Sequence, residues 1–144
     1  MSRRLLVIIV LAVVGVAVSL YLLTVHWGWW QAVCLLGVSN CELVNLSRWS
    51  ELFGIPVALL GALAYSAIIV ASALIARNLY VEYARPALFF IAAIGVAFSA
   101  YLTYIEAFVL YEYCSWCVLS ALLITAIAIL SIIELRATAP ASGK

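Results

Sequence analysis

Four long apolar windows without a charged residue constrain the fold of this chain more than any other feature. They cover residues 5–25, 53–76, 86–105 and 115–133. A helix of about 20 apolar residues crosses about 30 Å of hydrocarbon, so each window is close to or above the length that spans a bilayer. Charged residues make up only 9% of the chain, against about 25% in soluble domains. We therefore predict an all-α membrane protein, a four-transmembrane-helix bundle in a lipid bilayer.

The windows fill most of the chain and leave room for one domain. We predict a single transmembrane domain over residues 1–137, with spans near 5–27, 53–76, 86–107 and 114–135, followed by a short polar tail at 138–144. A cleaved secretory signal is the alternative for the first window, but the apolar core of such a signal has about 7 to 15 residues. The first window is longer, so we expect it to remain as the first span.

The basic residues indicate which way the predicted bundle faces. With an even number of spans both termini lie on one side, and that side receives six of the seven basic residues, namely Arg3, Arg4, Arg77, Arg85, Arg136 and Lys144. By the positive-inside rule this side is cytoplasmic, so residues from about 26 to 52 and from about 106 to 114 connect the spans outside a cell membrane. The net charge of +1 and the spread of the basic residues argue against a nucleic-acid partner.

All four cysteines fall in or beside the predicted outer connections. Cys34 and Cys41 lie in the first connection, while Cys114 and Cys117 form a Cys-x-x-Cys motif at the start of the last span. This spacing puts both sulfurs on one helix face, with the first above unpaired N–H groups that favour a thiolate. The second sulfur lies one turn deeper, towards the apolar bundle. The pattern favours thiol–disulfide exchange, with a lipid-soluble quinone as acceptor because no haem, flavin or nicotinamide motif is visible.

Other roles for these residues stay open at the level of sequence. Two inert disulfides could brace the outer loops of a non-enzymatic membrane scaffold. A zinc site could use four thiolates, but the Cys-x6-Cys spacing is unusual for zinc and an oxidising compartment disfavours free thiolates, so no metal is predicted. We interpret His26 as a residue of an interfacial aromatic belt rather than a proton carrier. Glu106 and Glu112 are interpreted as solvated loop charges rather than groups that tune the thiols.

Several motifs together give the chain a resemblance to the vitamin K epoxide reductase family. They extend over essentially the whole chain and consist of Cys34, Cys41, Ser47-Arg48-Trp49, Phe53-Gly54-Ile55-Pro56, Gly61 and Cys114-x-x-Cys117. The resemblance implies that Cys34 and Cys41 are a shuttle pair on an outer loop, and that Cys114 and Cys117 are the active pair beside a quinone.

The resemblance also implies a short half-helix that anchors the outer loop in the membrane. Independently of the family, Ser47 can cap such a helix through Leu52. We place Ser47, Phe53 and Trp116 at the expected quinone site. The quinone would be of the ubiquinone or menaquinone type.

The activity implied by the resemblance is that of a quinone-dependent thiol-disulfide oxidoreductase. It would oxidise a separate, extracytoplasmic thioredoxin-fold dithiol protein and so support disulfide bond formation, as in microbial members without a fused thioredoxin-like domain. Vitamin K epoxide or quinone recycling is the alternative. Against it, Ala121 stands where vertebrate members have a pocket tyrosine, and no Asn lies near the start of the second span. The unrelated disulfide-bond protein B family has similar parts, but its Cys-x-x-Cys belongs to the first outer region.

Overall fold

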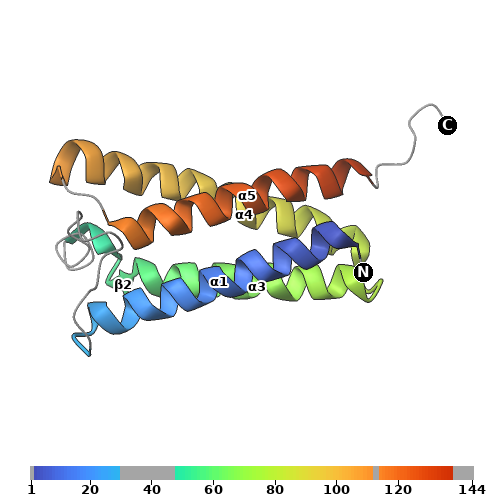
Figure 1. Cartoon of the computed structure of the whole chain (residues 1–144), viewed down its shortest axis with the longest axis horizontal. Coiled ribbons are helices and arrows are strands. Elements are labelled where there is room, and N and C mark those ends of the chain that lie inside the picture. The colour runs from blue at the N-terminus through green and yellow to red at the C-terminus, as the bar shows by residue number, and fades with distance from the viewer. Residues whose placement is uncertain (1, 30–47, 112–113, 138–144) are drawn as a thin grey trace.

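The computed structural model describes residues 2–29, 48–111 and 114–137, and these form a bundle of long helices (Figure 1). The helices are α1 (Arg3–His26), α3 (Val57–Ala76), α4 (Val81–Ile105) and α5 (Ser115–Ala137). Each is long and apolar enough to cross a membrane. The predicted all-α, four-span membrane fold is therefore confirmed. We call the end of the bundle where α1 finishes and α5 begins the cysteine end, and the opposite end the far end.

Small residues let the helices approach one another closely. A Cβ atom added at Gly15 of α1 would overlap the ring of Tyr65 on α3. A Cβ at Gly95 of α4 would lie 2.7 Å from Cγ1 of Ile124 on α5. Lipid tails are as apolar as leucine, so helices in a bilayer associate through close van der Waals packing of this kind. Here the contacts join α1 to α3 and α4 to α5, the two pairs with the most extensive contact in the bundle.

A buried carboxylate connects three helices at the far end. Glu134 of α5 is only 5% exposed. Its Oε2 lies 3.5 Å from Nε of Arg4 on α1, and its Oε1 lies 3.6 Å from Nη2 of Arg85 on α4. A carboxylate within a membrane bundle is tolerated when opposite charges accompany it. These ion pairs therefore hold α1, α4 and α5 together where the N-terminus and the end of α5 meet (Figure 1).

The segment before α3 is a small hairpin rather than the first turn of that helix. Strands β1 (Glu51–Leu52) and β2 (Ile55–Pro56) pair antiparallel. Phe53 and Gly54 between them have φ angles of 54° and 79°, the positive values that a tight two-residue hairpin requires. α3 consequently begins at Val57, later than the start near residue 53 expected from the sequence.

Two further element boundaries differ from the expected ones. The described part of the expected half-helix is a 3₁₀ turn, η2 (Arg48–Ser50), and the chain then enters β1 instead of continuing as a helix to Leu52. α4 begins at Val81, before Pro86. A charge-free window marks only the part of a helix that fits in hydrocarbon, whereas α4 also includes the charged residues of its first turns.

Candidate active site

Cys114 and Cys117 form the start of α5. The carbonyl of Cys114 accepts the N–H of Val118 at 3.0 Å, the first helical hydrogen bond. The N–H of Cys117 donates to Sγ of Cys114 at 3.3 Å. The sulfur thus takes the place that an oxygen takes in a usual helix N-cap. Both residues are thiols in this structure, and Cys114 is fully buried.

The surroundings of Cys114 favour its thiolate. The thiol of Cys117 donates a hydrogen bond to this sulfur and lowers the pKa of Cys114 below its ordinary value. Burial acts in the opposite direction, the backbone N–H groups of Cys117 and Trp116 lower the pKa again, and the carboxylate of Glu106 raises it. The net shift is downward. A thiol with a lowered pKa is a better leaving group in exchange and supplies more thiolate near neutral pH.

Removing the Cys117 thiol should raise the pKa of Cys114. In a reduced protein whose Cys34 and Cys41 are replaced by alanine, we expect Cys117→Ala to move the titration midpoint of Cys114 to higher pH, because its main hydrogen-bond donor is lost. Cys117→Ser keeps a donor and should leave the midpoint low. The ultraviolet absorbance of the thiolate against pH, corrected with Cys114→Ala, measures both. An unchanged midpoint in the alanine variant would show that the thiol of Cys117 does not lower the pKa of Cys114.

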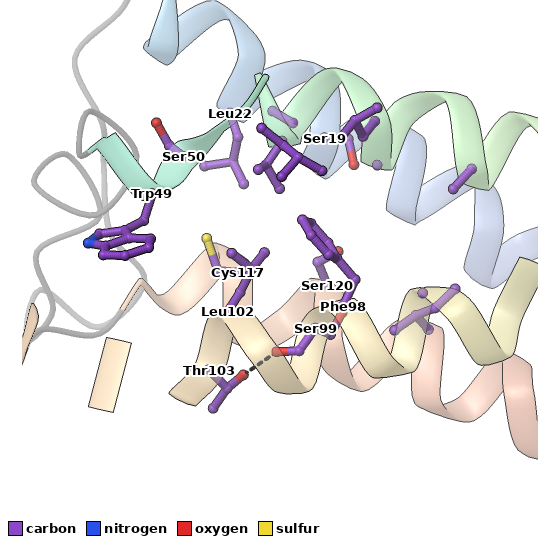
Figure 2. Close-up of a pocket in the computed structure, with 18 of the residues that line it drawn as sticks. Ser19, Leu22, Trp49, Ser50, Phe98, Ser99, Leu102, Thr103, Cys117 and Ser120 are labelled. Atoms are coloured by element: carbon purple, nitrogen blue, oxygen red, sulfur yellow. Dashed lines mark hydrogen bonds between the residues drawn. The ribbon is translucent and has the colours of Figure 1, made fainter. Parts of the chain in front are cut away.

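Cys117 also lines a cavity of about 440 Å³. Figure 2 shows its sulfur directed into this space, with Trp49 on one side and Phe98 and Ser120 on the other. The walls are mainly apolar and come from all four long helices and the segment before α3, and they include Leu22, Leu52, Leu60, Ile94, Phe98 and Leu102. Cavities of about 300–1,000 Å³ with a few polar groups are typical small-molecule sites. A flat apolar ligand bound in this cavity would therefore be in contact with the sulfur of Cys117.

A pair of hydroxyl groups lies one helical turn deeper in this cavity. The hydroxyl of Tyr65 donates to the carbonyl oxygen of Ser120 at 2.8 Å and lies 2.9 Å from its Oγ. Ser120 follows Cys117 by three residues, so it lies on the same face of α5 and about 4.5 Å further along the helix axis. Sequence reasoning missed both residues, although the spacing from Cys117 could have identified Ser120.

Glu106 is a second residue of the site that the sequence interpretation misplaced. It is 3% exposed, its Oε2 accepts the backbone N–H of Cys114 at 3.2 Å, and it lines the cavity. The interpretation as a solvated loop charge is wrong because α4 does not end in a loop there. It continues as a π-helical turn, η3 (Glu106–Leu110), which keeps Glu106 inside the bundle. The signal was present in the sequence, since Glu106 is the only charged residue between positions 86 and 111.

The structure brings some of the expected site residues together and not others. Phe53 is 96% exposed at the tip of the hairpin and does not line the cavity, which Leu52 lines instead. Trp116 packs on the ring of Tyr21 with 5.1 Å between centroids and does not line the cavity either. Three expected site residues lie outside the described part of the chain: Cys34, Cys41 and Ser47.

His26 joins the end of α1 to the hairpin. Its Nε2 lies 3.0 Å from Oε1 of Glu51, and its Nδ1 lies 3.4 Å from Oγ of Ser50. Ser50 lines the cavity. These contacts hold the segment before α3 against α1 and so fix one wall of the cavity.

A comparison with models of protein families identifies a match that includes the residues of this site. A model of the vitamin K epoxide reductase family matches residues 6–132, a range that includes all four cysteines and every residue named above as lining the cavity. The family performs redox chemistry in membranes, related to quinones and disulfides. With the match extending over most of its 144 residues, the chain belongs to the vitamin K epoxide reductase family of membrane oxidoreductases.

Proposed function

We propose that this protein oxidises the dithiol of an extracytoplasmic thioredoxin-fold protein and passes the electrons through two cysteine pairs to a membrane quinone. The observation that carries the proposal is the position of Cys117. Its sulfur lines an apolar cavity within the helix bundle, and its thiol is hydrogen-bonded to Cys114 at the start of α5. A thiol pair at the mouth of such a cavity is suited to pass electrons from a protein outside the hydrocarbon to an acceptor inside it.

The cavity has the properties that a quinone requires. Its walls are mostly apolar, and its polar groups include the hydroxyls of Tyr65 and Ser120 and the carboxyl of Glu106. A quinone ring offers two carbonyl oxygens as hydrogen-bond acceptors, and hydroxyl groups can donate to them. When bound, a quinone would accept two electrons and two protons. The residues of the chain would hold the ring beside Cys117 and keep water from the reacting sulfur.

In the proposed relay, a thiolate of the partner attacks Cys34 in the disulfide that joins it to Cys41. After exchange the partner carries a disulfide, and Cys34 and Cys41 are thiols. Cys41 then attacks Cys114 in the disulfide of the active pair, so that Cys117 leaves as a thiolate, and Cys34 completes the exchange. Two electrons have now reached Cys114 and Cys117. Re-formation of their disulfide releases these electrons to the acceptor in the cavity.

The topology supports an encounter between the two pairs. His26 and Glu51, which are in contact, lie on either side of the segment that contains Cys34 and Cys41, and Trp49 lines the same cavity as Cys117. The segment that carries the shuttle pair thus begins and ends at the cysteine end of the bundle. Arg3, Arg4, Arg77, Arg85 and Arg136 belong to the opposite ends of the helices, which favours a cytoplasmic far end.

Reconstitution in detergent tests the proposal. The purified protein is mixed with a reduced, soluble thioredoxin-fold protein and a quinone, and quinone reduction is followed by absorbance. We expect reduction only when all three are present. A variant that keeps Cys34 but has alanine at the other three cysteines should form a stable mixed disulfide with a single-cysteine partner whose thiol has first been activated as a disulfide with thionitrobenzoate, which then leaves, whereas replacement of Cys34 as well should not. A wild-type protein that neither reduces quinone nor traps the partner would instead be a scaffold.

A further inference from the structure

Glu106 is a buried carboxyl group without an ionic partner among the residues that the structure describes. Of the six arginines in the described part of the chain, five belong to the far end and Arg48 alone belongs to the cysteine end. The guanidinium carbon of Arg48 lies 5.0 Å from the ring centroid of Trp49. An acidic side chain in a membrane bundle is costly, and such residues commonly line pathways for protons or substrates. The placement of Glu106 thus calls for a role beyond packing.

Glu106 is close to both cysteines of the motif, to Cys114 through a hydrogen bond and to Cys117 through the cavity that both residues line. Its Oε2 accepts the backbone N–H of Cys114 at 3.2 Å, which holds the carboxyl beside that residue. It lines the cavity together with Cys117. Cys114 is fully buried and is not among the lining residues, so a proton on its sulfur can reach the cavity only through a neighbouring group, either the thiol of Cys117, which is hydrogen-bonded to it, or the carboxyl of Glu106. Among the described residues, Glu106 is the acidic group that lies beside Cys114 and also lines the cavity.

The local backbone gives Glu106 this position. It is the first residue of the π-helical turn η3, and its carbonyl oxygen accepts the N–H of Tyr111, which has a φ of 54° and ends the turn. Single π turns inside α-helices occur frequently at functional sites. The turn keeps the carboxyl within the bundle at the point where the chain reverses towards Cys114.

Within residues 2–29, 48–111 and 114–137, few other titratable groups lie near Glu106. Cys117 and Tyr65 are the titratable residues that share the cavity lining with it. Cys114 contacts it through the backbone. His26 and Glu51 pair with each other and, like Arg48, do not line the cavity.

We propose that Glu106 is a proton carrier of this site, which takes up a proton when Cys114 and Cys117 are oxidised and delivers it to the ligand in the cavity. The inference rests on the proposed function and deepens it. Formation of the disulfide breaks two S–H bonds and makes one S–S bond, and it releases two electrons and two protons. The quinone takes up both electrons and both protons and becomes a quinol. Glu106 carries the proton from the Cys114 side and is unchanged at the end of the cycle.

A rival role for Glu106 is to hold the backbone of Cys114 in place. Substitution by glutamine distinguishes the two roles, because glutamine can replace the hydrogen-bond acceptor but not the acid. In Glu106→Gln the amide oxygen can still accept the N–H of Cys114, but the side chain no longer binds and releases a proton. Glu106→Asp keeps the acid one methylene shorter, and Glu106→Ala removes both the acid and the hydrogen-bond acceptor.

The test is a single-turnover reaction in which the reduced, purified protein is mixed with excess quinone over a range of pH. We expect Glu106→Gln to slow quinone reduction by about 10²-fold or more, the usual size of a general acid–base contribution. Its thermal unfolding temperature should remain that of the wild type, and so should the thiol exchange between the soluble dithiol protein and the pair Cys34 and Cys41, a step in which Cys114 takes no part. Glu106→Asp should recover part of the rate, with a pH profile displaced from that of the wild type.

The possible outcomes separate the two proposals. If the wild type reduces quinone and Glu106→Gln does so at the same rate, Glu106 is not a proton carrier, while the proposed function stands. If the wild type does not reduce quinone at all, the proposed function itself fails. Should the glutamine variant not fold, the aspartate variant decides the question, since an unchanged rate and pH profile in Glu106→Asp would overturn the proton-carrier role.

Discussion

Replacing Cys117 with alanine should lower the rate of quinone reduction by on the order of 10³-fold or more, as expected when a reacting nucleophile is removed. The sulfur of Cys117 lines the cavity, and its thiol is the hydrogen-bond donor to Cys114. Without it, Cys114 cannot close a disulfide within the motif, so no second electron is available from this pair. Stopped-flow absorbance of the quinone with the fully reduced protein measures the loss directly.

A matched control lies next to Cys117 on the same helix. Val118 is 37% exposed and does not line the cavity, so Val118→Ala should reduce quinone at a rate close to that of the wild type. Circular dichroism and the unfolding temperature of both variants establish that the bundle is intact. Equal rates for Cys117→Ala and the wild type would refute the electron path proposed here.

Gly15→Leu should destabilise the bundle by about 2–3 kcal/mol, in the range seen when side chains are forced into a packed core. Even a Cβ atom at this position would overlap the ring of Tyr65. Tyr65 is 3% exposed, and its hydroxyl donates a hydrogen bond to Ser120 on α5, so the ring cannot move aside without breaking this bond between two helices. Denaturant unfolding of the purified protein in detergent measures the change in the free energy of unfolding.

Two controls isolate the contact between Gly15 and Tyr65. Val14→Leu enlarges a neighbouring side chain that is 41% exposed, and it should change stability by less than about 0.5 kcal/mol. Gly15→Leu in a Tyr65→Ala background should cost much less than in the wild type, because residues in contact do not contribute additively. An equal cost in both backgrounds would show that the ring of Tyr65 does not cause the destabilisation.

The sequence was sufficient to predict the helices and the position of the Cys-x-x-Cys motif at the start of the last one. Charge-free windows predict membrane spans because an unpaired charge is costly in hydrocarbon, whatever the helix packs against. Cys114 and Cys117 could be placed at a helix start because their spacing of three residues is a local property. The match of the family model to residues 6–132 agrees with the resemblance inferred from the cysteines and the short motifs.

The residues that the sequence did not predict depend on neighbours distant in the chain. The contact of Tyr65 with Ser120 joins two helices, and no local pattern encodes it. Phe53 was expected in the cavity, but the positive φ angles of the two-residue turn leave its side chain exposed. Glu106 was misinterpreted because the third span was expected to end near residue 107, at the edge of an outer loop, whereas the π-helical turn keeps this residue within the bundle. In each case the local sequence admits more than one backbone path, and tertiary packing selects between them.

The ion pairs of Glu134 imply that the two ends of the bundle differ in rigidity. At the far end, charges on three helices attract one another in a medium of low polarity, and separating them would expose each charge to lipid. At the other end the cavity interrupts the packing and one wall is a short hairpin. Thermal motion of the helices should therefore be smallest at the far end and largest at the cysteine end. A flat ligand should enter and leave the cavity at the cysteine end, where separating the helices costs the least energy.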